Sequence, residues 1–110
     1  MKFRAGVLHG EEVSDLLNCA NENDFALPAV NVIGTSSINA VLEAASEVNS
    51  PVIVQFGHRA CCFYAGDSLS NEGEKASVAG GIAAAMHVHT VAKAYGVPVI
   101  LHTDHCQKNL

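Results

Sequence analysis

Apolar residues recur at helical spacing in three segments of the chain. Spacings of three and four residues place apolar side chains on one face of a helix. This pattern predicts a helix over residues 11–22, a second one capped by Ser36 or Ser37, and a third over residues 76–95. The apolar faces are Val13, Leu16, Leu17 and Ala20 in the first, Ile38, Val41, Leu42, Ala45 and Val48 in the second, and Val78, Ile82, Ala85, Met86, His89 and Ala92 in the third. Gly96 is the expected C-cap of the third helix, with Pro98 two residues beyond it.

Three extended runs alternate with these helices, at residues 27–32, 51–56 and 97–102. The run at 51–56 is continuously apolar and β-branched up to Gln55, which favours a strand buried on both faces, as in parallel sheets. Residues 57–74 are rich in Gly, Ser and Asn and are expected to form a loop. The predicted order is a helix followed by β-α-β-α-β.

This order predicts right-handed crossovers and a parallel sheet. Two architectures are open: a doubly wound sheet and a (β/α)8 barrel. A barrel typically needs about 250 residues, so three strands are only its opening third. We therefore interpret residues 1–110 as an incomplete part of a single domain.

Composition narrows the class of protein. The chain has 110 residues, 49% hydrophobic and 15% charged, with a net charge of −5, which is typical of a globular protein and argues against a nucleic-acid-binding face. No apolar run approaches the length of a membrane span, and the first residues do not read as a signal peptide. Four scattered cysteines, Cys19, Cys61, Cys62 and Cys106, indicate reduced thiols in a cytoplasmic protein.

Polar residues follow each predicted strand, at the end where parallel α/β folds place their functional groups. The first strand ends near Asn31, the second at residues 55–59 and the third at residues 102–105. The third end carries Asp104 next to His105, a pair suited to metal chemistry because imidazole binds zinc and an unligated carboxylate can move a proton. From spacing alone, a solvated loop with paired side chains explains this cluster equally well.

Segments along nearly the whole chain closely resemble the class II, zinc-dependent fructose-1,6-bisphosphate aldolases. The matching segments are residues 25–32, 37–45, 50–55 and 95–106. Residues 70–73 and 81–85 look like the class IIA branch, which includes fungal enzymes. The resemblance implies a TIM (β/α)8 barrel, of which this chain would supply an N-terminal helix and the first three strands.

The resemblance also implies reversible cleavage of fructose 1,6-bisphosphate into dihydroxyacetone phosphate and glyceraldehyde 3-phosphate, in glycolysis and gluconeogenesis. It makes Asp104 the acid/base, His105 one of three histidine ligands of a catalytic Zn²⁺, and Asn31 a substrate-positioning residue. It implies a homodimer that acts on a sugar bisphosphate, without nucleic acid or membrane partners, and a monovalent cation as a further candidate cofactor. Relatives specific for tagatose bisphosphate, the alternative substrate, more often carry Leu where Thr103 stands, so Thr103 favours fructose.

The sequence departs from the family pattern after the second strand. The family usually has Ser-Asn-Gly-Gly there, and its Ser hydroxyl contacts the substrate, whereas this chain has Gly57-His58-Arg59-Ala60. Gly57 has no hydroxyl, so that substrate contact is lost. Either substrate handling has diverged, with Arg59 as a new phosphate contact, or the gene copy has decayed or contains a sequencing error.

We expect the other histidines in helices and strands to have structural roles. His87 and His89 lie two apart and do not share a helical face, so we expect His89 to pack inward and His87 to lie nearer the surface. His102 is expected to orient Asp104 or to line the barrel, because residues two apart on a strand point to the same side. His9 and His58 carry no assignable chemistry.

The remaining zinc ligands of the family lie beyond the position of Leu110. One protein ligand cannot hold a catalytic zinc, so we expect the 110 residues alone to be inactive and to belong to a longer enzyme. The alternative is a non-catalytic, truncated aldolase relative that acts as an interaction module.

Overall fold

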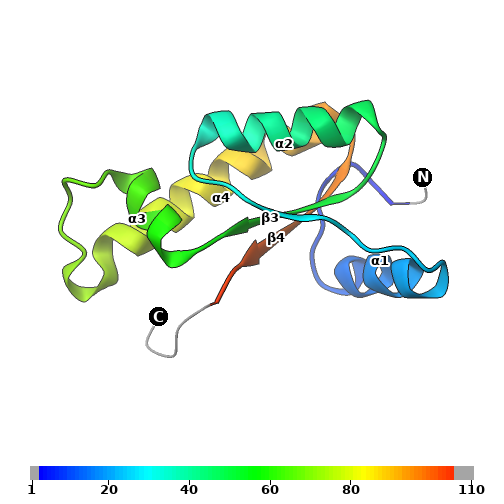
Figure 1. The fold of residues 1–110 in the computed structure, drawn as a ribbon, viewed down its shortest axis with the longest axis horizontal. Helices are drawn as coiled ribbons and strands as arrows, with labels where there is room; N and C mark the ends of the chain where they lie inside the picture. Colours follow the sequence, from blue (N-terminus) through cyan, green and yellow to red (C-terminus); the bar gives the residue numbers. More distant parts are fainter. Residues whose placement is uncertain (1–2, 106–110) are drawn as a thin grey trace.

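The computed structural model describes residues 3–105, which form a parallel sheet covered by helices (Figure 1). The strands run in the order β1-β4-β3-β2, and every pairing is parallel. Their bounds are Gly6–Val7 for β1, Ala29–Asn31 for β2, Val52–Phe56 for β3 and Pro98–Thr103 for β4. The predicted parallel sheet is therefore confirmed.

Helices lie on both sides of this sheet (Figure 1). They are α1 (Glu11–Glu22), α2 (Thr35–Glu47), α3 (His58–Ala65) and α4 (Lys75–Tyr95), with a short 3₁₀ helix, η1 (Glu72–Glu74). Helices α2 and α4 cover one face, where they bury Val54 of β3, Val99 of β4 and Val32, the residue that follows β2. Helix α1 covers part of the other face, where Leu16 packs with Ile100 and Ile53. Within residues 3–105, no helix combines the length and apolarity that a membrane crossing requires.

The second helix begins one residue before the predicted caps. It starts at Thr35 with Gly34 at the N-cap position, so the prediction of Ser36 or Ser37 as the cap is wrong. Ser37 instead reaches back from the first turn. Its Oγ accepts hydrogen bonds from the backbone N–H groups of Ile33 (2.9 Å) and Gly34 (3.1 Å). A serine near a helix start can satisfy the backbone from inside the helix as well as from the cap.

Residues 57–74 are not the loop that the sequence predicted. Helix α3 occupies residues 58–65 and η1 residues 72–74. No residue of α3 is fully buried, although Cys61 and Tyr64 pack against the hydrophobic core. It docks on α4 where Gly80 lets the two backbones approach, since a Cβ at Gly80 would lie 1.7 Å from the Cys61 carbonyl oxygen.

The buried face of α4 is made of small residues. Its fully buried positions are Ala76, Ser77, Gly80, Ala84, Val88 and Ala92. The larger apolar residues of the predicted face, Val78, Ile82 and Met86, are 55%, 57% and 64% exposed. The prediction that His89 packs inward is also wrong: His89 is exposed, while His87 is half-buried and its Nε2 lies 2.9 Å from Asn39 Oδ1 on α2.

Strand β3 is fully buried on one face only. Val52, Val54 and Phe56 are buried, whereas Ile53 and Gln55 are partly exposed, so burial on both faces was wrong for the described residues. The sequence also missed β1, whose two residues pair with Pro98 and Val99 at the start of β4. Two residues are too few to show a strand periodicity.

An ion pair joins the segment before β1 to α1. Arg4 donates from Nε to Glu12 Oε2 (2.6 Å) and from Nη2 to Glu12 Oε1 (2.7 Å). The hydrogen bond from Arg4 is the main reason that the pKa of Glu12 lies below its ordinary value. Because the folded-state pKa is lowered, the pair stabilises the fold above the unfolded-state pKa of about 4.3 and loses that effect as pH falls through the folded pKa.

We expect Glu12→Gln to lower the melting temperature at about pH 6 and to lower it less at about pH 3, because acid favours the protonated carboxylate of the parent and so weakens the pair. Thermal unfolding followed by circular dichroism at both pH values measures this difference. Glu11→Gln is the matched control, because Glu11 lies in the same helical turn without a described ion pair. Equal melting temperatures for parent and Glu12→Gln at about pH 6 would show that the pair does not stabilise the fold.

Candidate active site

Three polar side chains form a row across neighbouring strands. The register pairs Asn31 of β2 with Gln55 of β3, and Gln55 with His102 of β4. Side chains alternate along a strand, and the flanking residues Val32, Val54, Phe56, Val99 and Leu101 all belong to the cluster under α2 and α4. The row therefore points to the opposite face of the sheet, near the carboxyl ends of the strands.

Gln55 and His102 are in direct contact within this row. Gln55 Oε1 lies 3.0 Å from His102 Nδ1, so the imidazole donates this hydrogen bond when its proton is on Nδ1. Gln55 is partly exposed and His102 exposed, so both side chains are open to an incoming ligand. The structure thus gives His102 a partner on β3. A hydrogen bond from His102 to Asp104, the other predicted role, is not among the contacts of the described residues.

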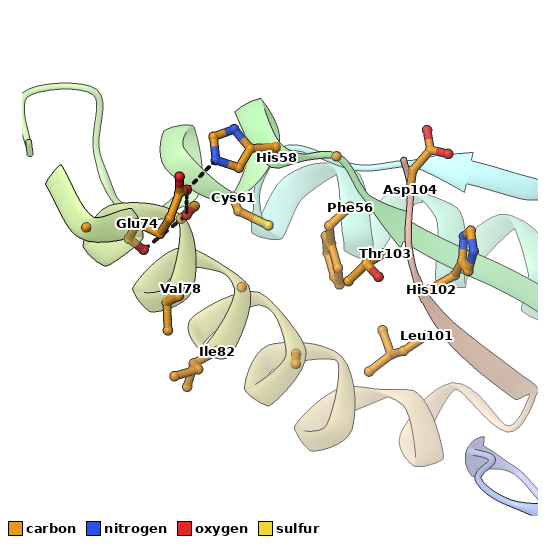
Figure 2. A pocket seen from close by; sticks show the side chains of 15 residues that line it. Phe56, His58, Cys61, Glu74, Val78, Ile82, Leu101, His102, Thr103 and Asp104 are labelled. Carbon is orange, nitrogen blue, oxygen red and sulfur yellow. Dashed lines mark hydrogen bonds and ion pairs between the residues drawn. The ribbon is translucent and has the colours of Figure 1, made fainter. Parts of the chain in front are cut away.

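Asp104 and His105 follow directly after β4. The backbone N–H of Asp104 donates to the carbonyl oxygen of Phe56 (2.9 Å), which holds the end of β4 beside the end of β3. The Asp104 side chain is 27% exposed and the His105 side chain 94% exposed. Figure 2 shows His102 and Asp104 pointing away from α4, whereas Phe56 and Leu101 lie on the side of the strands that faces it.

The backbone of His105 is unusual. Its φ of 50° places it in the left-handed region, which residues with a Cβ rarely adopt. Such geometry is concentrated at functional sites. His105 Nε2 lies 3.8 Å from Asp104 Oδ1, so the two side chains are close without a short hydrogen bond.

The corner between β3 and α3 borders this site. Gly57 is the N-cap of α3, and the Cys61 N–H donates to its carbonyl oxygen (3.1 Å). Open space lies around the Gly57 Cα, where a Cβ would meet no atom within 4 Å. Arg59, in the first turn of α3, is exposed and lines a separate shallow pocket with Ile33 and Asp67.

A cavity of about 780 Å³ lies between the carboxyl ends of the strands and α4 (Figure 2). Most of its wall is apolar, with Phe56, Val78, Ile82 and Leu101, and the candidate site contributes Gly57, His102 and Asp104. A doubly charged sugar phosphate would lose its hydration against such a wall without compensation. This cavity suits an apolar packing partner better than a phosphorylated substrate.

The described residues hold only part of a metal site. Among residues 3–105, no group of three or more His, Cys, Asp or Glu side chains is close enough to bind one ion. His105 fits as a single donor, since its ring is exposed at the strand ends and neutral imidazole is a common zinc ligand. Catalytic zinc sites use three protein ligands, so His105 alone would not complete such a site.

Comparison with known proteins identifies the family. The model of the family described as "Fructose-bisphosphate aldolase class-II" matches residues 11–109. This chain belongs to the class II fructose-bisphosphate aldolase family. It is 57% identical over 107 residues to the fructose-bisphosphate aldolase of Campylobacter jejuni, covering 97% of this chain and 29% of that enzyme. It is 52% identical over 108 residues to the class 2 enzyme of Escherichia coli K12, covering 97% of this chain and 30% of the relative.

The crystal structure of the Campylobacter jejuni aldolase matches this fold with a TM-score of 0.85 at 56% identity, covering 92% of this chain and 28% of that one. The choice between a doubly wound sheet and a barrel is thereby decided: β2, β3 and β4 are neighbouring strands of a class II aldolase TIM barrel. The chain spans about 30% of the length of the curated relatives that it matches.

The sequence did not predict two side-chain contacts in and beside the candidate site. The sequence placed Gln55 at the end of a strand but did not pair it with His102. The signal was available, because the two residues lie at similar distances from the ends of neighbouring parallel strands. His58 was given no chemistry, yet its Nε2 lies 2.8 Å from Glu74 Oε2. No pattern in the sequence connects residues 58 and 74, because their contact depends on how α3 packs on α4.

Proposed function

We propose that this protein catalyses the reversible cleavage of fructose 1,6-bisphosphate to dihydroxyacetone phosphate and glyceraldehyde 3-phosphate. The polar residues at the carboxyl ends of its strands would form part of the active site. The observation that carries the proposal is the convergence of Asn31, Gln55, His102 and Asp104 on one face of the sheet, in a chain of this family. Polar side chains at the carboxyl ends of barrel strands are where enzymes of this fold bind and convert substrates.

Each residue has a proposed task. Asp104 exchanges a proton with the hydroxyl group that becomes the aldehyde oxygen, and its backbone hydrogen bond to Phe56 places residue 104 beside the end of β3. Asn31 binds substrate hydroxyl groups through its side-chain amide, from the first strand of the row. Gly57 offers no side chain, so at this corner only its backbone can contact the substrate.

His105 is proposed as one ligand of a catalytic zinc ion. A bound zinc would polarise the substrate carbonyl and stabilise the negative charge that develops as the carbon–carbon bond breaks. The exposed ring of His105 and its left-handed backbone support this role. We extend the proposal to a cytoplasmic homodimer that takes a sugar bisphosphate as its small-molecule partner.

A chimera tests the proposed function without depending on the length of this chain. Residues 3–105 replace the matching part of the Campylobacter jejuni enzyme, and the zinc-loaded chimera is assayed with fructose 1,6-bisphosphate and with tagatose 1,6-bisphosphate. We expect cleavage with a preference for fructose 1,6-bisphosphate. A folded, zinc-binding chimera without cleavage activity would refute the proposal, and a preference for the tagatose substrate would refute its specificity.

A further inference from the structure

A single carboxylate oxygen collects three side-chain contacts at the junction of α3 and α4. Glu74 Oε2 lies 2.8 Å from His58 Nε2, accepts a hydrogen bond from Ser77 Oγ (3.0 Å) and accepts another from Asn71 Nδ2 (3.3 Å). Asn71 Oδ1 in turn accepts from the backbone N–H of Ser77 (2.8 Å). Figure 2 shows Glu74, at the N-cap of α4, and His58, at the start of α3, reaching toward each other.

The backbone of Glu74 is held in an unfavourable conformation. Its φ of 62° is left-handed, and the preceding Gly73 has a φ of 64°. A residue with a Cβ remains in this region only when its surroundings fix it there. The contacts of the Glu74 carboxylate provide such a restraint, so the side chain is ordered rather than a free surface glutamate.

His58 links the Glu74 carboxylate to the candidate site, because it lies next to Gly57 in the chain. It is the first residue of α3 and follows Gly57, whose carbonyl oxygen accepts from the Cys61 N–H (3.1 Å). Phe56, one residue earlier, accepts from the backbone N–H of Asp104 (2.9 Å). Helix α3 has no fully buried residue of its own, so the His58–Glu74 contact adds to the packing of Cys61 and Tyr64 on the core and to the close approach at Gly80 in holding the helix in position.

We propose that Glu74 is a positioning residue: through His58 it fixes the corner between β3 and α3 beside Asp104, and it holds that corner most firmly while the His58–Glu74 pair is charged. That this corner belongs to an active site rests on the proposed function. The contact between His58 and Glu74 and its dependence on charge do not rest on the proposed function. They can be tested on the chain itself.

Few other titratable side chains lie near the His58–Glu74 pair among the described residues. Cys61 from α3 and His102 and Asp104 from the end of β4 line the same cavity as His58 and Glu74. Glu72 and Lys75, on either side of Glu74 in sequence, are exposed. The hydrogen bond from His58 is the largest cause of the lowered pKa of Glu74, so the carboxylate stays ionised at mildly acidic pH.

Hydrogen exchange of the Cys61 amide reports on the corner, because that N–H donates to Gly57. Its protection is compared with that of α4 amides at about pH 5.5 and about pH 8, on either side of the range in which histidines ordinarily lose their charge, after correction for intrinsic rates. We expect the relative protection of Cys61 to fall about threefold at the higher pH, as suits a partly exposed ion pair.

Glu74→Gln and His58→Gln should each remove this pH dependence, since neither variant can form the oppositely charged pair. Glu72→Gln and His89→Gln are matched controls that make the same changes at exposed positions, and both should retain it. Equal protection of Cys61 at both pH values in the parent would overturn the proposal, and so would a threefold change that persists in Glu74→Gln. The aldolase assay of the chimera plays no part in this readout, so the two proposals fail separately.

Discussion

Replacing Asp104 with Asn in the zinc-loaded chimera is expected to lower kcat for fructose 1,6-bisphosphate cleavage by about 10²- to 10⁴-fold, the usual contribution of a general acid or base. Asn has nearly the same shape as Asp but cannot exchange a proton. The backbone hydrogen bond from residue 104 to Phe56 is unaffected by the change, so the end of β4 should keep its place. The loss should therefore appear in kcat with little change in zinc content.

Asp15→Asn in the same chimera is the control for removing one carboxylate. Asp15 is exposed on α1 and is not one of the strand-end residues of the candidate site. We expect its steady-state kinetics to match those of the chimera. If Asp104→Asn retains full kcat with unchanged zinc content, Asp104 is not the acid/base.

The second large effect is expected for Gly80→Ala, which should destabilise the chain by about 1–3 kcal/mol, the range for overpacked sites. A Cβ at residue 80 would lie 1.7 Å from the carbonyl oxygen of Cys61 and 2.6 Å from its carbonyl carbon. Both are backbone atoms, so no side chain can rotate away and α3 must move off α4. Urea unfolding of the 110-residue chain measures the free energy, and amide chemical shifts of α3 report its displacement.

Gly81→Ala is the matched comparison, one residue along the same helix. Its Cβ would meet only Cys61 Sγ, at an ordinary contact distance of 3.6 Å. Alanine favours the helix over glycine by about 1 kcal/mol, so Gly81→Ala should leave stability unchanged or raise it. Equal stabilities for the two variants would show that α3 does not pack as closely on α4 as described.

Local chemistry made much of the fold predictable. Gly96 is left-handed with a φ of 75° and ends α4, as a glycine after the last helical turn should. The runs at 51–56 and 97–102 became β3 and β4, because β-branched residues next to Pro51 and Pro98 favour extended backbone. The order of α1, β2, α2, β3, α4 and β4 needed only such local signals.

The incorrect predictions, for α3 and for the buried face of α4, have a different physical cause. Helix α3 has eight residues and buries none of them completely, so its sequence alone gave only a weak helical signal. The inward face of α4 is small because α3 and the sheet approach its backbone closely, whereas counting large apolar residues pointed to Val78, Ile82 and Met86. The part of the candidate site that was predicted, Asn31, Asp104 and His105, came from strand ends and from resemblance to the family.

The sequence by itself determined the parallel α/β arrangement, the membership of an aldolase family and the polar residues at each strand end. These features depend on periodicity, on turn residues and on motifs that lie close together in the chain. Only the tertiary structure decided that Gln55 contacts His102 and that His58 contacts Glu74. Those pairs are set by strand register and by the packing of two helices, which join residues that are distant in sequence and carry no shared local pattern.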